Sequence, residues 1–483
     1  MHLAVIQRIM GLLLMLFSIT LVPPVIIDLI YQEHAAHTFF YSYLFLLCLG
    51  FLLFLPVRNV KNDLRLRDGF VVAVLFWLVL GLAGALPLYF NEHIEISVAG
   101  AIFESISGLT TTGATVFVGL DQLPHSILFY RQELQWLGGM GIIVLAVAVM
   151  PMLGIGGMQL YKAETPGPVK DSKLTPRIAE TAKALWYIYL ALTVVCAFSY
   201  WIAGMTFFDA VAHSFATVSN GGFSTHDSSV NYFDNAAIEF VAIIFMLLGG
   251  VNFALHFTVV RSKSLMPYIR DAEFQLYASM LIVVFTLTTY VLYTQSILHD
   301  LPLAFREAVF QTVSITTTSG FVTTDYSTWP VFVPVLLVFS SFIGGCAGST
   351  GGGLKVIRVL LMIKQGQREL FRLIHPNARV VVKLGKQPVD NRVIDAVWGF
   401  FAAYVGLFAL MMLILMFTGL DQVTAFSAVA ATMNNLGPGL GEVSANYSSL
   451  SDFNKLLLCF SMLLGRLEIF TLLVLFMPAF WRK

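Results

Sequence analysis

One pattern, AIFESISGLTTTGAT from Ala101, recurs three times in the chain. The other copies are AVAHSFATVSNGGFS from Ala210, AVFQTVSITTTSGFV from Ala308 and AFSAVAATMNNLGPG from Ala425. Aligned on the first alanine without gaps, all four copies carry a glycine twelve residues on, at Gly113, Gly222, Gly320 and Gly437. Each copy begins with an apolar run at helical spacing and ends in Thr, Ser, Asn and Gly, which favour caps and turns. The sequence therefore predicts four internal repeats, each a short helix followed by a non-helical loop.

The composition is that of an integral membrane protein. Of the 483 residues, 58% are hydrophobic and only 12% are charged, whereas soluble domains contain about a quarter charged residues. The mean hydropathy is +0.81. The formal net charge is zero, so binding to nucleic acid has no electrostatic support.

Long apolar stretches flank every copy of the repeat. Two N-terminal spans are predicted at 4–30 and 39–57. The repeats then lie between paired spans at 70–90 and 125–155, 184–204 and 237–260, 274–295 and 331–363, and 393–418 and 454–480. A full span needs about 20 apolar residues, so the repeat helices, at about a dozen residues each, should enter the membrane and turn back.

The predicted fold is therefore an all-α integral membrane protein with about ten spans and four re-entrant half-helices. Four parallel helix–pore-helix/loop–helix repeats would surround a central pore, preceded by two extra transmembrane helices. The predicted divisions are a two-helix extension at 1–68 and repeats at 69–160, 161–270, 271–392 and 393–483.

The lysine and arginine residues predict the orientation. All but four of the 28 fall on one side of the predicted spans, and the exceptions are Arg131, Arg306, Lys455 and the intramembrane Arg466. This positive-inside bias predicts cytoplasmic N- and C-termini and places the four repeat loops on the outer side.

Four equivalent loops at membrane depth are typical of an ion path. Irregular backbone is tolerated there only when it is buried in protein or lines a water-filled cavity. Carbonyl groups around a shared axis would replace the hydration shell of a cation, and the half-helix C-termini would favour positive charge. Asp and Glu are absent from 111–114, 220–223, 318–321 and 435–438, which argues against a calcium site.

Several motifs resemble the Trk/Ktr/HKT superfamily of potassium transporters, and within it the TrkH/TrkG group of bacterial Trk potassium-uptake subunits. They are TTTGAT at 110–115, SNGGFSTHD at 219–227, TTTSGF at 316–321, NNLGPGLG at 434–441, GGCAGSTGGGLKVIR at 344–358 and GRLEIFTLLVLF at 465–476. The resemblance covers essentially the whole chain and implies potassium-selective translocation across the bacterial inner membrane. Glycine rather than serine at Gly113 implies potassium rather than sodium.

The resemblance also implies which residues bind the ion. Backbone carbonyls would coordinate potassium at Thr111, Thr112 and Gly113; Asn220, Gly221 and Gly222; Thr318, Ser319 and Gly320; and Asn435, Leu436 and Gly437. Family members are homodimers, regulated by a cytosolic TrkA-type ring that binds NAD(H) and ATP or ADP. The chain itself has no recognisable nucleotide fold. Basic loops 162–183 and 355–392 are candidate docking surfaces, although ordinary positive-inside charge explains them equally well.

A glycine-rich stretch interrupts the span 331–363 and is a candidate gate. Its residues include Gly344, Gly345, Gly348, Ser349, Thr350, Gly351, Gly352 and Gly353. Each helical glycine costs about 1 kcal/mol relative to alanine, so the helix should break there and face the cavity. A packing kink is the simpler alternative.

Arg466 lies inside the last predicted span, where an arginine is a functional hypothesis by default. Pointing into the pore, it would raise the barrier to cations; a structural ion pair is the alternative. His125, His213 and His226 are isolated in sequence and lack metal-ligand spacing, so no role is assigned to them.

The sequence also bears on a coupled symporter, a sodium-permeable relative and a membrane enzyme. A proton- or sodium-coupled symporter would have midplane carboxylates and inverted repeats, but these repeats are parallel and the spans hold few acids, chiefly Glu104 and Glu468. A sodium-permeable relative is a further alternative. A membrane enzyme would need a nucleophile, base or metal set at one depth, and none is evident, so the protein is not expected to be an enzyme.

Overall fold

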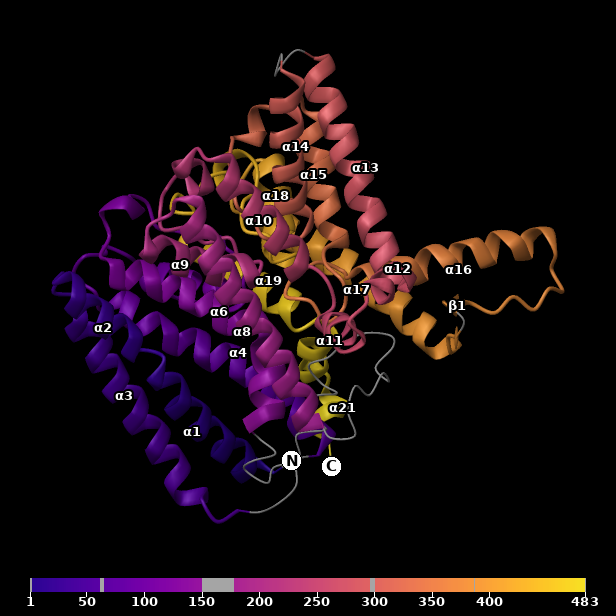
Figure 1. The fold of residues 1–483 in the computed structure, drawn as a ribbon. Coiled ribbons are helices and arrows are strands. Elements are labelled where there is room, and N and C mark those ends of the chain that lie inside the picture. The colour runs from indigo at the N-terminus through magenta and orange to yellow at the C-terminus, as the bar shows by residue number, and fades with distance from the viewer. Residues whose placement is uncertain (1, 61–64, 150–177, 296–299, 386, 483) are drawn as a thin grey trace.

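The computed structural model describes residues 2–60, 65–149, 178–295, 300–385 and 387–482, and these residues are predominantly α-helical (Figure 1). A two-stranded antiparallel hairpin, β1 (Lys383–Leu384) with β2 (Gln387–Pro388), accompanies the helices. Six described helices are long and apolar enough to cross a membrane, and two bent helix pairs raise the number to eight. The predicted all-α membrane fold is confirmed, while the boundary predicted at 160 falls outside the described residues.

The N-terminal extension is a helical hairpin. It comprises α1 (Leu3–Ile19), α2 (Val22–Tyr31) and α3 (Ala36–Phe54), followed by the short η1 (Leu55–Val57). α1 and α3 cross closely because both lack a side chain at the contact. A methyl group on Gly11 would lie 2.7 Å from the Gly50 carbonyl oxygen.

Four units of similar construction follow (Figure 1). The first contains α4 (Leu66–Tyr89), α5 (Val98–Leu109) and α6 (His125–Val149). The second contains α8 (Ile178–Ala203), α9 (Phe207–Val218), α10 (Ala236–Gly249) and α11 (Phe253–Ser262), followed by α12 (Met266–Arg270). The third contains α13 (Ala272–Thr294), α14 (Leu301–Thr316), α15 (Phe332–Ile343) and α16 (Val356–Ile374). The fourth contains α17 (Asn391–Phe417), α18 (Gln422–Met433), α19 (Asp452–Arg466), α20 (Phe470–Leu473) and α21 (Pro478–Trp481).

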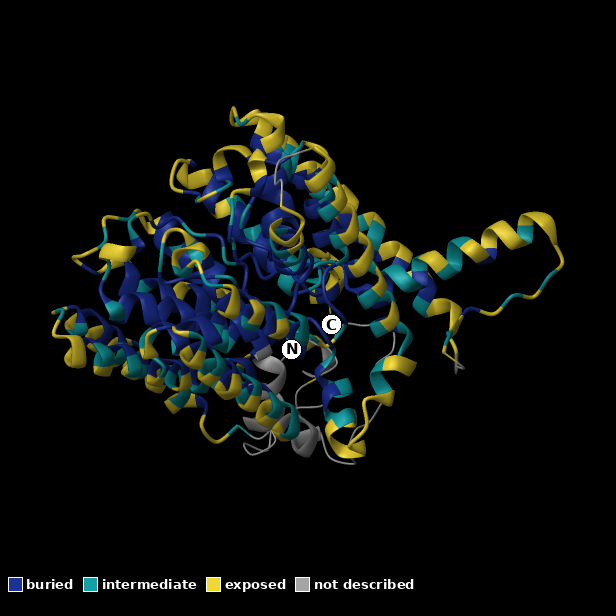
Figure 2. Ribbon diagram, turned by 45° about the horizontal axis from the view of Figure 1, so that its top comes forward, coloured by how far each residue is buried: buried dark blue, intermediate teal, exposed yellow. Residues whose placement is uncertain are grey.

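The four short helices α5, α9, α14 and α18, here called the pore helices, begin at residues that favour an N-cap. The Ser97 hydroxyl accepts from Gly100 N, the Thr206 hydroxyl from Asp209 N, and the Asp421 carboxylate from Val423 N. Such caps satisfy backbone donors that a helix start leaves unpaired. The inward faces of these helices form the buried centre of the molecule (Figure 2).

The sequence predicts a broken second helix in the third unit, where α15 ends at Ile343 and α16 begins at Val356, and the second helices of the other units are bent as well. The α10–α11 pair bends by 97° and the α19–α20 pair by 108°. α6 kinks at Gly141, where φ is 50° and ψ is −161°, close to the 70° and −153° of Gly344. The second helix therefore departs from a straight course in all four units.

In three of the units, a glycine at a very close contact lies three residues before the break. Gly138, Gly249 and Gly465 pack against the end of the pore helix in the same unit. A methyl group there would lie 1.8 Å from the Leu109 oxygen, 3.0 Å from the Val218 oxygen and 2.2 Å from the Met433 oxygen, respectively. Ser341 occupies this position in the third unit. In these three units the second helix thus comes very close to the end of the pore helix just before it changes direction.

α16 projects away from the body, and both termini lie near one another (Figures 1 and 2). The projecting part carries large exposed hydrophobic side chains. They are Ile363, Leu370, Phe371, Leu373 and Ile374.

Candidate functional site

The four loops that follow the pore helices share one backbone conformation. Each pore helix ends four residues before its aligned glycine, at Leu109, Val218, Thr316 and Met433. The residue two before the glycine has a positive φ in every loop: Thr111 (54°), Asn220 (51°), Thr318 (61°) and Asn435 (52°). The glycines are also positive, at 80°, 76°, 81° and 99° for Gly113, Gly222, Gly320 and Gly437. A β-branched threonine rarely adopts this conformation, so two of the four loops are strained at that residue.

One hydrogen bond closes each pore helix in the same way. The donors are the amides of Thr112, Gly221, Ser319 and Leu436, and the acceptors are the carbonyls of Ser107, Ala216, Ser314 and Ala431, at 2.7–2.9 Å. The bond spans five residues, as in a Schellman motif, whose left-handed residue reverses the chain. The sequence repeat is therefore also a repeat of backbone geometry.

The four loops form a closed ring in chain order. A methyl group on Gly113 would lie 2.1 Å from the carbonyl oxygen of Gly221, in the second loop. The same relation links Gly222 to Ser319 (1.8 Å), Gly320 to Leu436 (2.2 Å) and Gly437 to Thr112 (2.6 Å). Each glycine thus abuts the carbonyl that precedes the glycine of the next loop, and the fourth loop returns to the first. All twelve residues predicted to contact the ion belong to this ring.

A cavity of about 310 Å³ opens on one side of the ring, and all four aligned glycines line it. Its wall also includes Arg131, His226, Asp227 and Asp325, from the segments that follow the loops. The cavity is here called the outer vestibule, because the positive-inside bias predicts that this side faces out.

The glycine-rich segment 344–355 packs against the opposite side of the ring. The Thr350 hydroxyl donates to the carbonyls of Val218 and Gly249, both at 3.1 Å. Gly352 N donates to the Thr318 hydroxyl (2.6 Å), and Gly353 N donates to the Asn434 carbonyl (3.1 Å). The segment therefore contacts the second, third and fourth units together.

A carboxylate anchors both ends of this segment. Glu273 of α13 accepts hydrogen bonds from Ala347 N (2.6 Å) and Ile357 N (3.1 Å) through the same oxygen. Lys355 also donates to the carbonyl of Gly351 within the segment. Glu273 was not predicted from the sequence, since nothing nearby connects it to Ala347 and Ile357, which lie 74 and 84 positions further along.

Arg466 connects the same segment to the first unit. Its guanidinium donates to the carbonyl of Thr350 (3.2 Å) and to the carbonyls of Gly138 and Gly139, beside the kink in α6. It is the last residue of α19, at the bend between α19 and α20. Glu468, two residues on, pairs with Arg358 instead. The predicted gate consists of eight residues of the glycine-rich segment and Arg466. All of them thus lie together on the side of the ring opposite the vestibule.

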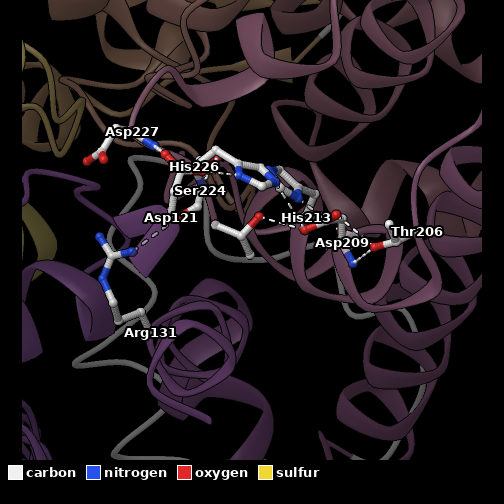
Figure 3. Close-up of polar contacts among 9 residues, drawn as sticks. Asp121, Arg131, Thr206, Asp209, His213, Ser224, His226 and Asp227 are labelled. Carbon is white, nitrogen blue, oxygen red and sulfur yellow. Dashed lines mark hydrogen bonds and ion pairs between the residues drawn. The ribbon is translucent and has the colours of Figure 1, made fainter. Parts of the chain in front are cut away.

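A polar cluster borders the outer vestibule (Figure 3). His226 Nδ1 lies 2.5 Å from Asp121 and its Nε2 lies 3.5 Å from Asp209. His213 contacts the backbone oxygen of Asp209 (3.0 Å) and the Ser224 hydroxyl (3.0 Å). Their spacing in the sequence had suggested that His213 and His226 are isolated, but in the structure both belong to this cluster. Burial alone would lower the pKa of His226, but Asp209 and Asp121 outweigh it and raise that pKa above its ordinary value.

Arg131 is fully buried beside the vestibule. It forms an ion pair of 2.7 Å with Glu104, whose side chain is also fully buried. The same guanidinium donates to the Ser224 carbonyl (3.1 Å) and the Thr115 hydroxyl (3.1 Å), joining the segments after the first and second loops. His125, by contrast, lies apart from this cluster and contacts Glu33 (2.6 Å).

A sequence profile described as "TrkH: Cation transport protein" matches residues 35–483. The chain is 57% identical over 479 residues to the "Trk system potassium uptake protein TrkH" of Vibrio parahaemolyticus, across 99% of both chains. It is 54% identical to the protein of that name from Escherichia coli K12, across 100% of both chains, and 41% identical to E. coli TrkG, across 100% and 99%. The crystal structure of the potassium transporter TrkH from V. parahaemolyticus matches with a TM-score of 0.91 and 53% identity, over the full length of both chains.

Proposed function

Since the chain belongs to the TrkH family of cation transport proteins, we propose that it is the membrane subunit of a Trk-type potassium-uptake system. Potassium would pass through the ring of four loops. The closed contact of every aligned glycine with the next loop's carbonyl is the observation that carries this proposal. Carbonyl oxygens set around one axis suit a dehydrated monovalent cation.

The proposed ligands are the backbone carbonyls of the twelve ring residues named above. Their segments contain no carboxylate, so selectivity would depend on the number and position of neutral oxygens. The pore helices support this assignment, because all four end at the ring and bring the partly negative ends of their dipoles toward it. Purified protein in liposomes should therefore carry potassium, and a tenfold excess of sodium should compete weakly. Equal competition by sodium would contradict potassium selectivity.

We propose that segment 344–355 and Arg466 form the gate. Arg466 supplies a fixed positive charge next to the path, which opposes cation passage. The hydrogen bond that the Thr350 hydroxyl shares between two carbonyls of the second unit would hold the closed position. Thr350→Val preserves the shape but removes this shared hydrogen bond, so basal potassium flux should rise several-fold, since a neutral bond contributes about 1 kcal/mol. Basal flux at or below that of the unaltered protein would contradict the gate.

Control by a partner, assembly and location are part of the same proposal. The protein would be a homodimer in the bacterial inner membrane with cytoplasmic termini, and a cytosolic ring that binds NAD(H) and ATP or ADP would operate the gate. The exposed apolar side chains on the projecting α16 support a protein contact there. The candidate docking surface at 355–392 includes this helix, whereas residues 162–177 of the other candidate surface are not described.

A coupled symporter is the second candidate, and one residue favours it. Glu133 in α6 is buried, and its Oε2 has no hydrogen-bond partner among the described residues. The expectation that Glu104 and Glu468 are the main acids of the spans is therefore incomplete. If a proton moves through Glu133, Glu133→Gln should abolish potassium-linked proton flux; a simple conducting pathway predicts normal potassium flux in this variant.

A further inference from the structure

The second loop differs from the others at the residue before the aligned glycine. The first, third and fourth loops have Thr112, Ser319 and Leu436 at this position, whereas the second has Gly221. The missing side chain is replaced by one from another element, Gln135 of α6. A methyl group on Gly221 would lie only 2.4 Å from Gln135 Cδ and 2.5 Å from its Oε1.

Gln135 is fully buried, and both ends of its carboxamide are hydrogen-bonded to the second loop. Its Nε2 donates to the Gly221 carbonyl at 2.6 Å, and its Oε1 accepts from Phe223 N at 3.0 Å. The orientation of the carboxamide follows from chemistry, because a backbone N–H can only donate. Gln135 therefore holds the peptide groups on both sides of Gly222.

Because of this arrangement, the four carbonyls of the ring differ in their hydrogen bonding. Of the four carbonyls that precede the aligned glycines, that of Gly221 accepts a side-chain hydrogen bond, and the described residues provide none to the other three. The corresponding positions of the other second helices, three residues before the small residue at the close contact, hold Met246, Val338 and Met462. Apolar side chains there cannot donate to a carbonyl.

We propose that Gln135 is a positioning residue that sets the cation selectivity of the pathway by fixing the Gly221 carbonyl. This inference rests on the proposed function of the ring as a potassium filter. Consecutive glycines rotate more freely than any other pair, so the loop at Gly221 and Gly222 needs an external constraint. The donated hydrogen bond also withdraws negative potential from one carbonyl, so the field at the ion is set by three unbonded oxygens and one bonded oxygen.

The first test replaces the side chain of Gln135 with one of similar size that has no carboxamide. Gln135→Met should still conduct potassium, but the potassium-to-sodium permeability ratio, measured from reversal potentials, should fall about tenfold, which corresponds to the loss of one good hydrogen bond. Gln132→Met is the matched control. Gln132 is equally buried, lies one turn earlier on α6, and its carboxamide has no hydrogen-bond partner among the described residues. This control should keep the original ratio.

A second test asks whether a side chain at position 221 can take the place of the Gln135 carboxamide. Gly221→Ser alone should abolish flux, because its Cβ would collide with Gln135. The double variant Gln135→Ala with Gly221→Ser gives the second loop the Ser–Gly pair of the third loop, and it should recover potassium flux and much of the selectivity.

Normal selectivity in Gln135→Met, or no recovery in the double variant, would overturn the proposal. If Gln135→Met fails to fold, the double variant alone decides. Failure of this proposal can be told apart from failure of the proposed filter, because without a filter the unaltered protein would not prefer potassium over sodium.

Discussion

Individual ion pairs differ in how much they stabilise the protein, because their burial differs. The Arg131–Glu104 pair beside the vestibule has side chains that are 1% and 0% exposed, whereas those of the Arg372–Glu369 pair on α16 are 41% and 52% exposed. Removing one member of a buried pair leaves an uncompensated charge and costs about 3–5 kcal/mol, and exposed pairs contribute about 0–1 kcal/mol.

Arg131→Met should therefore lower the thermal midpoint of the protein in detergent much more than Arg372→Met does. Both variants delete one positive charge, so the second controls for charge. Equal losses would mean that the burial of Glu104 has no energetic consequence.

His226 predicts a dependence of stability on pH. The groups that face it are Asp121, Asp209 and the neighbouring ring of His213, whose positive form would oppose that of His226. Its pKa is raised in the folded protein. The stabilisation it provides is therefore complete below the pKa of an unfolded histidine, about 6.5, and is lost as pH rises through the higher folded value.

The thermal midpoint should fall as pH is raised from about 6 to about 9, and His226→Gln should reduce this fall. His375→Gln, at an exposed histidine following α16, is the control and should leave the pH profile unchanged. A profile for His226→Gln that matches the unaltered protein would contradict the role of the two aspartates.

Among the elements, the pore helices were predictable and the breaks in the second helices mostly were not. The pore helices are short, capped and followed by turn-forming residues, all of which are local signals. The break at Gly344 was also predicted, because six of the ten residues in 344–353 are glycine. At 249–252 and 465–468 the glycine signal is weaker, with two glycines and one, so no break was predicted there, and the close contacts of these glycines with the loops come from tertiary packing.

Gly465 gives a direct measure of that contact. Gly465→Ala places a methyl group 2.2 Å from the backbone oxygen of Met433, so it should destabilise the protein and reduce flux at least tenfold. Gly406→Ala on α17, where a methyl group meets nothing within 4 Å, should instead be neutral or stabilise by up to about 1 kcal/mol. Normal flux and stability in Gly465→Ala would show that the close packing is not required.

For the whole molecule, the sequence predicts the number of units but not how they meet. The aligned glycines of neighbouring loops are about 100 residues apart in sequence, and their contact results from tertiary packing. The vestibule cluster was missed for the same reason, since Asp121, Asp209 and His226 come from three separate segments. Gln135 was missed because a single buried glutamine gives no signal until the glycine beside it is seen to lack room for a side chain.

The central claim is that the ring of four glycine-containing loops is the potassium-selective path. The most direct test is cation flux into liposomes containing the unaltered protein, Gly113→Ser or Gly119→Ala. Both glycines have a positive φ, but a Cβ on Gly113 would lie 2.1 Å from the Gly221 oxygen, whereas one on Gly119 would meet nothing within 4 Å. We predict strong potassium preference in the unaltered protein and in Gly119→Ala, and its loss in Gly113→Ser. Unchanged preference in a folded Gly113→Ser would contradict the claim.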